Sequence, residues 1–136
     1  MNAPSSDLQP GDVLPTQEYA VTRADLVRYA AASGDHNPIH QDEAVAASVG
    51  LPGVIAHGMF TMALAARAVD GWTGGARVVD LGCKFTQPVV VPAEGSVDVV
   101  VAGTVKKVEE GLVTIALEVT SGGRKVLGMP KAVVRA

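Results

Sequence analysis

Residues 55–69 form the longest helix-favouring segment of the 136-residue chain, and they carry a single charge, on Arg67. A surface helix needs a polar face, so a helix with one charge is expected to bury most of its circumference. About fourteen residues of helix span roughly 21 Å, a length that suits a helix cradled along a curved sheet. Gly71 and the glycine pair 74–75 predict its end. The rest of the chain must therefore supply a surface that wraps this helix.

After residue 76 the apolar period changes from helical to two, the pattern of strands with one buried face. Turn-forming residues at 109–111 and 121–123 predict hairpin connections between neighbouring strands. Pro130 cannot donate to a ladder and favours an edge position or a bulge in its strand. The expected strands are residues 79–85, 97–105, 113–119 and 125–134.

The first part of the chain predicts one strand and two helices. Residues 13–20 favour a strand, and Thr22 then opens a helix with Asp25 three positions on, a weaker version of the capping box. That helix is expected to end near residues 33–34, and residues 42–48 predict a second, short helix. A strand, helices and then antiparallel strands predict a single α+β domain over residues 1–136, with a long central helix buried against the sheet.

Composition excludes several classes of function. A hydrophobic fraction of 48% against 18% charged residues predicts a deep core or a buried oligomer interface, with flexibility only near residues 1–10. The net charge of −3 gives no basic field for nucleic acid. We expect no secretory signal, because the N-terminus has no basic region followed by an apolar core. We expect no membrane span, because the longest apolar run, at 59–69, carries Arg67 and is too short. Cys83 is the only cysteine, so no intrachain disulfide can form and the cytoplasm is the expected compartment.

Residues 33–40, Ser-Gly-Asp-His-Asn-Pro-Ile-His, carry a candidate acid–base pair. Pro38 prevents a regular helix, and Gly34 frees the backbone just before Asp35. We expect a tight turn that brings Asp35 and His40 toward one point. Such a pair can move a proton or activate a water without a metal. From these residues alone, polar side chains that merely stabilise a turn are the alternative.

Three stretches resemble the MaoC-like family of (R)-specific enoyl-thioester hydratases and dehydratases. The signature lies in residues 29–40 (Tyr-Ala-Ala-Ala-Ser-Gly-Asp-His-Asn-Pro-Ile-His), supported by residues 56–59 (Ala-His-Gly-Met). Residues 84–89 (Lys-Phe-Thr-Gln-Pro-Val) resemble a third family stretch, with lysine in place of the commoner arginine. The resemblance runs from about residue 13 to 135. It is strongest to the catalytic B-type subunit of actinobacterial (3R)-hydroxyacyl-ACP dehydratases.

This resemblance implies a hotdog fold, an antiparallel sheet wrapped around a long central helix. Two such folds pair, with the active site near their interface, so a homodimer or a heterodimer with a related hotdog subunit is implied. The implied activity is a hydro-lyase reaction, the reversible hydration of 2-enoyl thioesters to (3R)-hydroxyacyl thioesters carried on ACP or CoA. The dehydratase step of type II fatty-acid elongation is the preferred context. The alternative is an (R)-specific enoyl-CoA hydratase of β-oxidation or of polyhydroxyalkanoate precursor supply.

The resemblance also assigns roles to residues. Asp35 and His40 would hold one water and share the two proton transfers, while the backbone N–H of Gly58 would stabilise the thioester oxyanion. Asn37 would help to position the substrate, the water or the turn, and Met59 and Phe60 are candidates to line an acyl pocket. A hotdog thioesterase usually needs a carboxylate on the central helix, and residues 55–69 contain none. A catalytically silent hotdog subunit should lack the Asp–His pair.

The other candidates have plainer interpretations. His57, at the start of the central helix, is expected to cap or pack, and His36 to be an exposed or lining side chain. We expect no metal site, because Pro38 breaks the helical spacing of His36 and His40. Cys83 lies in the inward register of its strand and is interpreted as a core thiol. No cofactor is expected, since the chain has no Walker or Rossmann glycine pattern and no Gly-x-Ser-x-Gly motif.

Overall fold

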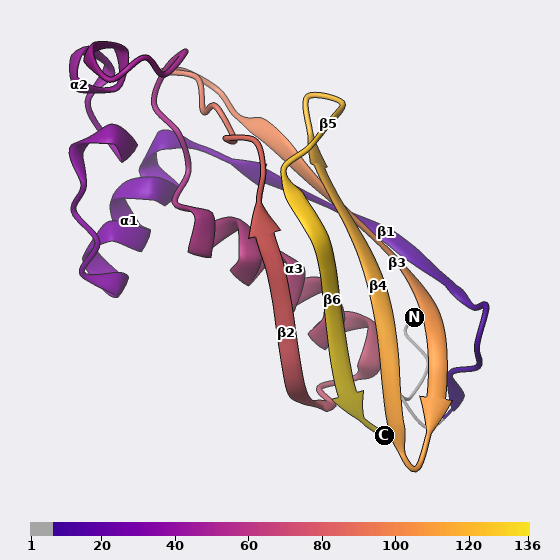
Figure 1. The fold of residues 1–136 in the computed structure, drawn as a ribbon. Coiled ribbons are helices and arrows are strands. Elements are labelled where there is room, and N and C mark those ends of the chain that lie inside the picture. Colours follow the sequence, from indigo (N-terminus) through magenta and orange to yellow (C-terminus); the bar gives the residue numbers. More distant parts are fainter. Residues whose placement is uncertain (1–6) are drawn as a thin grey trace.

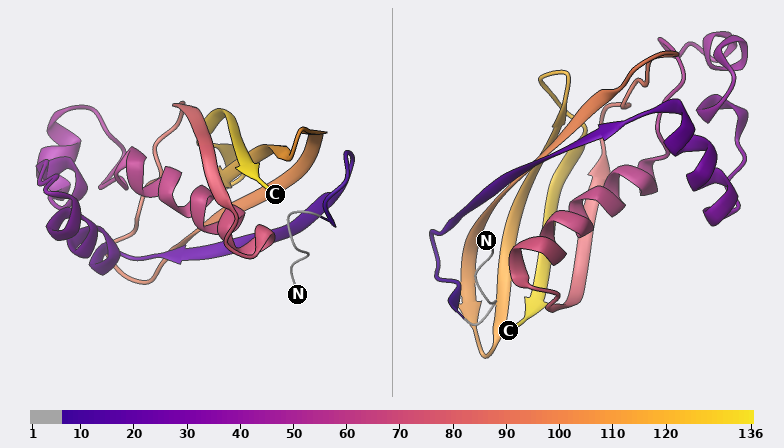
Figure 2. Two further views of the ribbon diagram at one scale, coloured as in Figure 1. Left: turned by 90° about the horizontal axis from the view of Figure 1, so that it is seen from below. Right: turned by 180° about the vertical axis from the view of Figure 1, so that it is seen from behind.

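In the computed structural model, which describes residues 7–136, a curved antiparallel sheet wraps around one long helix (Figures 1 and 2). The strand order is β1-β3-β4-β6-β2, and the short β5 pairs with β4 beside this path. This arrangement is the α+β architecture that the sequence predicts. The elements are β1 (Val13–Val21), α1 (Arg23–Ser33), the 3₁₀ helix η2 (Pro38–His40), α2 (Glu43–Ser48), α3 (Gly58–Thr73), β2 (Arg77–Phe85), β3 (Val97–Glu109), β4 (Leu112–Ser121), β5 (Arg124–Lys125) and β6 (Leu127–Arg135).

The core lies between α3 and the concave face of the sheet. Alternate residues of β3 and β4 point inward and are fully buried, as their period of two predicts. Valine and isoleucine favour such strands because their branched side chains pack well on a pleated surface. From the helix side, Leu64, Ala65, Ala68, Val69 and Trp72 complete the cluster.

Trp72 ties the C-terminal part of α3 to the sheet. Its side chain is 1% exposed, and its indole N–H donates to the carbonyl of Pro15 over 2.7 Å. The ring lies directly over Gly103 of β3, where a Cβ atom would come within 2.7 Å of it. The helix can approach the strand this closely only because residue 103 has no side chain.

Helix α3 differs from its expected bounds at both ends. It begins at Gly58 rather than at residue 55, because Ile55 forms a bridge with Val90 and the N–H of Ala56 donates to the carbonyl of Val89. It runs through Gly71 and ends at Thr73, followed by a left-handed Gly74 with φ of 67°. Long-range pairing overrides local helix propensity at the start.

One face of α3 packs on the sheet as expected, and the opposite face is uncovered in the single chain. In the view from behind, no other element of residues 7–136 lies over this outer face (Figure 2). Met59 is 55% exposed there, and Ala63 and Arg67 are exposed at helical spacing. The Arg67 guanidinium lies over the Tyr19 ring, 4.9 Å from its centre.

Of the two positions expected for Pro130, an edge strand or a bulge, the structure rules out the edge strand. The expected strand 125–134 divides into β5 and β6, and β6 lies between β4 and β2, so it is not an edge strand. Pairing of β6 with β4 ends at Lys131, and its register with β2 shifts between Gly82 and Lys84. Pro130 therefore occupies an irregular stretch, which was the other expectation.

Three further observations complete the fold. Residues 1–6 of the segment expected to be flexible lie outside the described residues, whereas Leu8 is buried in the core. Cys83 is half-buried and packs against the core cluster, as its register predicts. Within residues 7–136, no helix combines the length and apolar character that crossing a bilayer requires.

Candidate active site

The candidate site lies in the turn that connects α1 to η2. Thr22 and Asp25 form the capping box that fixes the start of α1. At its end, Gly34 adopts a left-handed conformation with φ of 79°, and its N–H donates to the carbonyl of Ala30. This conformation favours glycine and turns the chain sharply just before Asp35.

Two hydrogen bonds between near neighbours then hold the turn. The Asp35 carboxylate accepts from the N–H of Asn37, and the Asn37 side-chain oxygen accepts from the N–H of Ile39, each over 3.2 Å. Asn37 is thereby the N-cap of η2, with Pro38 at its first position, where the missing N–H costs nothing. The single 3₁₀ turn carries His40 back toward Asp35, which confirms the tight turn expected from the sequence.

His40 is buried, with 7% of its surface exposed, and its ring has a defined orientation. Its Nδ1 lies 2.7 Å from the carbonyl oxygen of Ile55. Because a carbonyl can only accept, Nδ1 carries the hydrogen, and in the neutral ring Nε2 then holds the lone pair. The turn therefore presents His40 with Nε2 as a proton acceptor.

His57 joins the pair, which the sequence interpretation did not foresee. Its side chain is 1% exposed and makes no capping bond to α3 within residues 7–136. Instead, its Nε2–H donates to the backbone carbonyl of Asp35 over 3.0 Å. Its ring stacks on that of His40, with centres 3.8 Å apart and planes inclined by 21°. The available signal was its place in the Ala-His-Gly-Met stretch, immediately before Gly58.

Burial is the main reason why the pKa of His57 lies below its usual value. The hydrogen bond to the Asp35 carbonyl acts in the opposite direction, and the neighbouring His40 lowers the pKa further. Burial and the adjacent ring therefore both favour the neutral form of His57.

One side-chain nitrogen or oxygen each from Asp35, His40 and His57 lies within 4.8 Å of the others. Asp35 is exposed while both histidines are buried, so the carboxylate stands at the solvent side of the cluster. Each ring already donates one N–H to a main-chain carbonyl. An exposed carboxylate beside an imidazole with a free ring nitrogen can bind and activate a water.

Gly58 places the N-terminus of α3 beside this cluster, directly after His57. The first N–H groups of a helix have no intrahelical partners, and they form the positive end of the helix dipole. A Cβ atom at Gly58 would lie 3.1 Å from the Phe85 ring. Glycine therefore leaves this helix end open to close approach by a ligand.

The two residues expected to line an acyl pocket have different surroundings. Phe60 packs edge-on against Tyr29, with ring centres 5.2 Å apart. It also lines a cavity of about 370 Å³ with Tyr19, Leu64 and Arg67 among others. Met59 lies on the uncovered face of α3. His36 is exposed, as expected.

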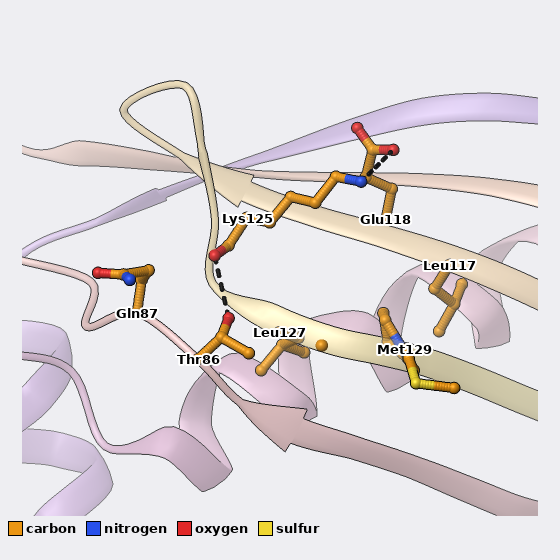
Figure 3. A pocket seen from close by; sticks show the side chains of 9 residues that line it. Thr86, Gln87, Leu117, Glu118, Lys125, Leu127 and Met129 are labelled. Atoms are coloured by element: carbon orange, nitrogen blue, oxygen red, sulfur yellow. Dashed lines mark hydrogen bonds and ion pairs between the residues drawn. The ribbon is translucent and has the colours of Figure 1, made fainter.

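A larger hollow, of about 480 Å³, lies where β6 parts from β4 (Figure 3). Thr86, Leu127 and Met129 line it, and the Lys125–Glu118 ion pair, at 3.9 Å, stands at its rim. Neither Asp35 nor His40 belongs to this lining. The hollow is therefore separate from the candidate acid–base groups.

The chain is similar to known proteins in sequence and in fold. The family described as MaoC like domain matches residues 7–122. The chain is similar to 3-hydroxyacyl-thioester dehydratase X of Mycobacterium tuberculosis, with 42% identity over 79 residues, 58% of this chain and 28% of that protein. The chain therefore spans less than a third of the length of this curated relative.

Two solved structures are similar over nearly the whole chain. One, described as a MaoC-like dehydratase, has a TM-score of 0.92 and 36% identity over 98% of this chain and 42% of that chain. The other is R-hydratase PhaJ1 from Pseudomonas aeruginosa, in its unliganded form. It has a TM-score of 0.85 and 28% identity, over 98% of this chain and 86% of that chain.

Proposed function

Because the chain belongs to the MaoC-like domain family and has its hotdog fold, we propose that it is a hydro-lyase acting on acyl thioesters. It adds water reversibly across a 2-enoyl thioester to give the (3R)-hydroxyacyl thioester. The observation that carries this proposal is the convergence of Asp35 and His40, with the His40 Nε2 lone pair left free. Names of a dehydratase and an R-hydratase among the similar proteins support the same reaction class.

In the hydration direction, Asp35 and His40 hold one water between them. The two groups take a proton from that water as its oxygen bonds to C3, and they deliver a proton to C2 on the same face. Acid–base groups placed in this way contribute about 10²–10⁴-fold to a rate. The fixed tautomer supports His40 Nε2 as one site that accepts a proton.

The thioester carbonyl becomes negatively charged as the enolate forms, and it needs fixed donors. We assign this role to the N-terminal end of α3, with the N–H of Gly58 as the first donor. Losing such a donor costs on the order of 3–4 kcal/mol in the barrier. Asn37 supports the site from the turn, since its side-chain oxygen already accepts from Ile39. Its NH₂ group remains to donate to the water or to the substrate.

The assembly that we propose is a homodimer or a heterodimer with a related hotdog subunit. Edge strand β2 exposes the apolar Val78, Val79 and Phe85, and Phe85 packs against the start of α3. Met59 of α3 is also exposed, and large apolar side chains left exposed in this way are typical of a protein interface. A partner on this surface would cover Met59 and complete an acyl pocket next to Phe60.

For the biological context, we propose the dehydratase step of type II fatty-acid elongation, in a B-type subunit acting on ACP thioesters. The alternative is an (R)-specific hydratase acting on CoA thioesters in β-oxidation or polyhydroxyalkanoate precursor supply. The single domain over residues 1–136 and the cytoplasmic location remain predictions. A thioesterase fits less well, because the one carboxylate of α3 is Asp70, near its C-terminal end.

The experiment offers the purified chain trans-2-enoyl thioesters on CoA and on ACP and follows loss of the conjugated thioester band. A thiol reagent in parallel detects hydrolysis, and chiral analysis identifies the hydroxyacyl product. The proposal predicts loss of the band without thiol release, and a (3R) product. Thiol release at the same rate as band loss would show a thioesterase instead. Activity confined to CoA substrates would favour the alternative context.

A further inference from the structure

We infer that His57 is a positioning residue that holds Asp35 and His40 at their working separation, an inference that rests on the proposed reaction. The sequence interpretation gave this side chain a capping or packing role. The structure shows it in contact with both members of the acid–base pair, through a different interaction with each. No other histidine in residues 7–136 bridges the two, because His36 is exposed.

The first interaction anchors Asp35. This residue lies in an exposed turn, and its other hydrogen bonds within residues 7–136 join near neighbours. Its N–H donates to the Ser33 hydroxyl, and its carboxylate accepts from the N–H of Asn37. The bond from His57 Nε2–H to its carbonyl comes from a residue 22 positions away and from a different element. It therefore fixes the turn to the start of α3, where the backbone is held by helical structure.

The second interaction fixes the ring plane of His40. One face of that ring lies against His57, at 3.8 Å between centres, while the hydrogen bond to Ile55 fixes its rotation. Tyr29 of α1 packs edge-on against His57, 4.8 Å away. His57 thus contacts an aromatic ring of α1 as well as His40, and its plane restricts tilting of His40 toward it.

The unused nitrogen of His57 explains why this arrangement tolerates two adjacent imidazoles. Its Nδ1 is buried and has no hydrogen-bond partner among residues 7–136. Protonation would place an unpaired N–H donor there, in a buried position. The titratable groups near His57 are Asp35, His36, His40 and Tyr29.

Position 57 also relates the acid–base pair to the proposed oxyanion site. His57 is the N-cap residue of α3, so its backbone directly precedes Gly58. One residue thus spaces three groups that must act together: Asp35, His40 and the helix N-terminus. A shift of about 1 Å among groups like these can reduce a rate by about 10²-fold.

Two substitutions separate the two contacts. His57→Gln retains a side-chain N–H near the Nε2 position, and so keeps the anchor on Asp35 while removing the stacked ring. His57→Phe retains a ring against His40 and removes the donor. Phenylalanine should leave few polar groups without a partner. The His57 Nδ1 has none to lose in the described chain, and the Asp35 carbonyl lies in an exposed turn that can bind water. His36→Gln makes the same chemical change at an exposed neighbour and serves as the control.

With the purified chain and its best 2-enoyl thioester, we expect kcat per folded molecule to fall about 10- to 100-fold in both variants. KM should stay near the wild-type value, and His36→Gln should retain wild-type kcat. Wild-type kcat in both variants would overturn the inference.

Ring ¹⁵N NMR tests the same inference without activity, since the chain has three histidines that single variants can assign. The wild type should show His57 as a neutral Nε2–H tautomer and His40 as the Nδ1–H tautomer. In His57→Gln, His40 should acquire a detectable share of the other tautomer. Unchanged His40 signals in both variants would contradict the inference. If wild type hydrates no thioester on CoA or ACP, the proposed function fails, and these spectra still decide whether His57 positions His40.

Discussion

Replacing Gly103 by alanine tests whether α3 is held against the sheet as tightly as the structure describes. A Cβ atom at this position would lie 2.7 and 2.8 Å from two ring atoms of Trp72, and 3.3 Å from a methyl group of Ile115. Carbon atoms pack best at about 3.5–4.0 Å. The ring has little freedom to retreat, because it is buried and its N–H is bonded to Pro15.

Two contributions set the expected size. Overpacking of a filled core costs about 1–3 kcal/mol, and the depth of this overlap places Gly103→Ala in the upper part of that range. Alanine in a strand recovers about 0.5–1 kcal/mol relative to glycine. The net loss in the free energy of unfolding should therefore be about 1–2.5 kcal/mol. Gly103 lies over the last turns of α3, far from Gly58, so kcat per folded molecule should be unchanged.

Urea unfolding measures this loss, at one protein concentration because any dimer makes stability concentration-dependent. Gly82→Ala in β2 is the matched control: no atom lies within 4 Å of its added Cβ, and its φ is not positive. The control should be neutral or stabilised by up to about 1 kcal/mol. If Gly103→Ala were as stable as the control, the close approach of Trp72 to β3 would be refuted.

Three further predictions concern single residues. Gly58→Ala should lower kcat/KM about 10- to 100-fold, because the added Cβ obstructs close approach to the helix N-terminus. The free energy of unfolding should fall little, because the Phe85 ring 3.1 Å from the new Cβ is 56% exposed and can move. If kcat/KM fell only in proportion to the fraction of folded protein lost, a role at the helix N-terminus would be contradicted. The hydrogen bond from the Thr22 N–H holds the pKa of Asp25 below its usual value. The ionised Asp25 therefore stabilises the fold at pH values above its unfolded pKa near 3.8, and this stabilisation is lost as the pH falls through the lower folded pKa. Asp25→Asn should thus lose about 0.5–1 kcal/mol at pH 7 and approach wild type in acid, as urea titrations from pH 7 to 3 would show. Burial raises the pKa of Cys83, so a thiol reagent should react more slowly with the folded chain than with the denatured one; equal rates would place the thiol at the surface.

The elements with strong local signals could be predicted from the sequence. The capping box at Thr22 and Asp25 marks the start of α1, and Asp42 caps α2 through the N–H groups of Ala44 and Val45. The period-two patterns correspond to β3 and β4, whose inward residues form the core. These features depend on neighbours a few residues apart, so a single sequence carries them.

Features set by distant pairing could not be predicted in the same way. The start of α3 is moved from residue 55 to Gly58 by the pairing of Ile55 with Val90, which no local propensity reveals. β6 pairs with β2 as well as β4, so Pro130 sits inside the sheet at an irregularity rather than at its edge. The outer face of α3 exposes Met59 and is not covered by residues 7–136.

The site followed the same division. The turn that brings Asp35 and His40 together is encoded by Gly34, Asn37 and Pro38, all within the segment itself. His57 joins from another element, and its contact with Asp35 links residues 22 positions apart. The sequence showed a histidine before a helix, and only the folded chain shows that its ring stacks on His40.

The most direct test of the account is the hydration rate of a trans-2-enoyl thioester in wild type, Asp35→Asn and His40→Asn. Asn at 35 can still accept from the Asn37 N–H, and Asn at 40 can still donate to Ile55, so both turns should persist. Asp42→Asn, the same change at a residue that caps α2, is the control. We expect kcat to fall about 10²–10⁴-fold in both site variants and to stay unchanged in the control. Site variants that fold and retain wild-type kcat would contradict the acid–base assignment.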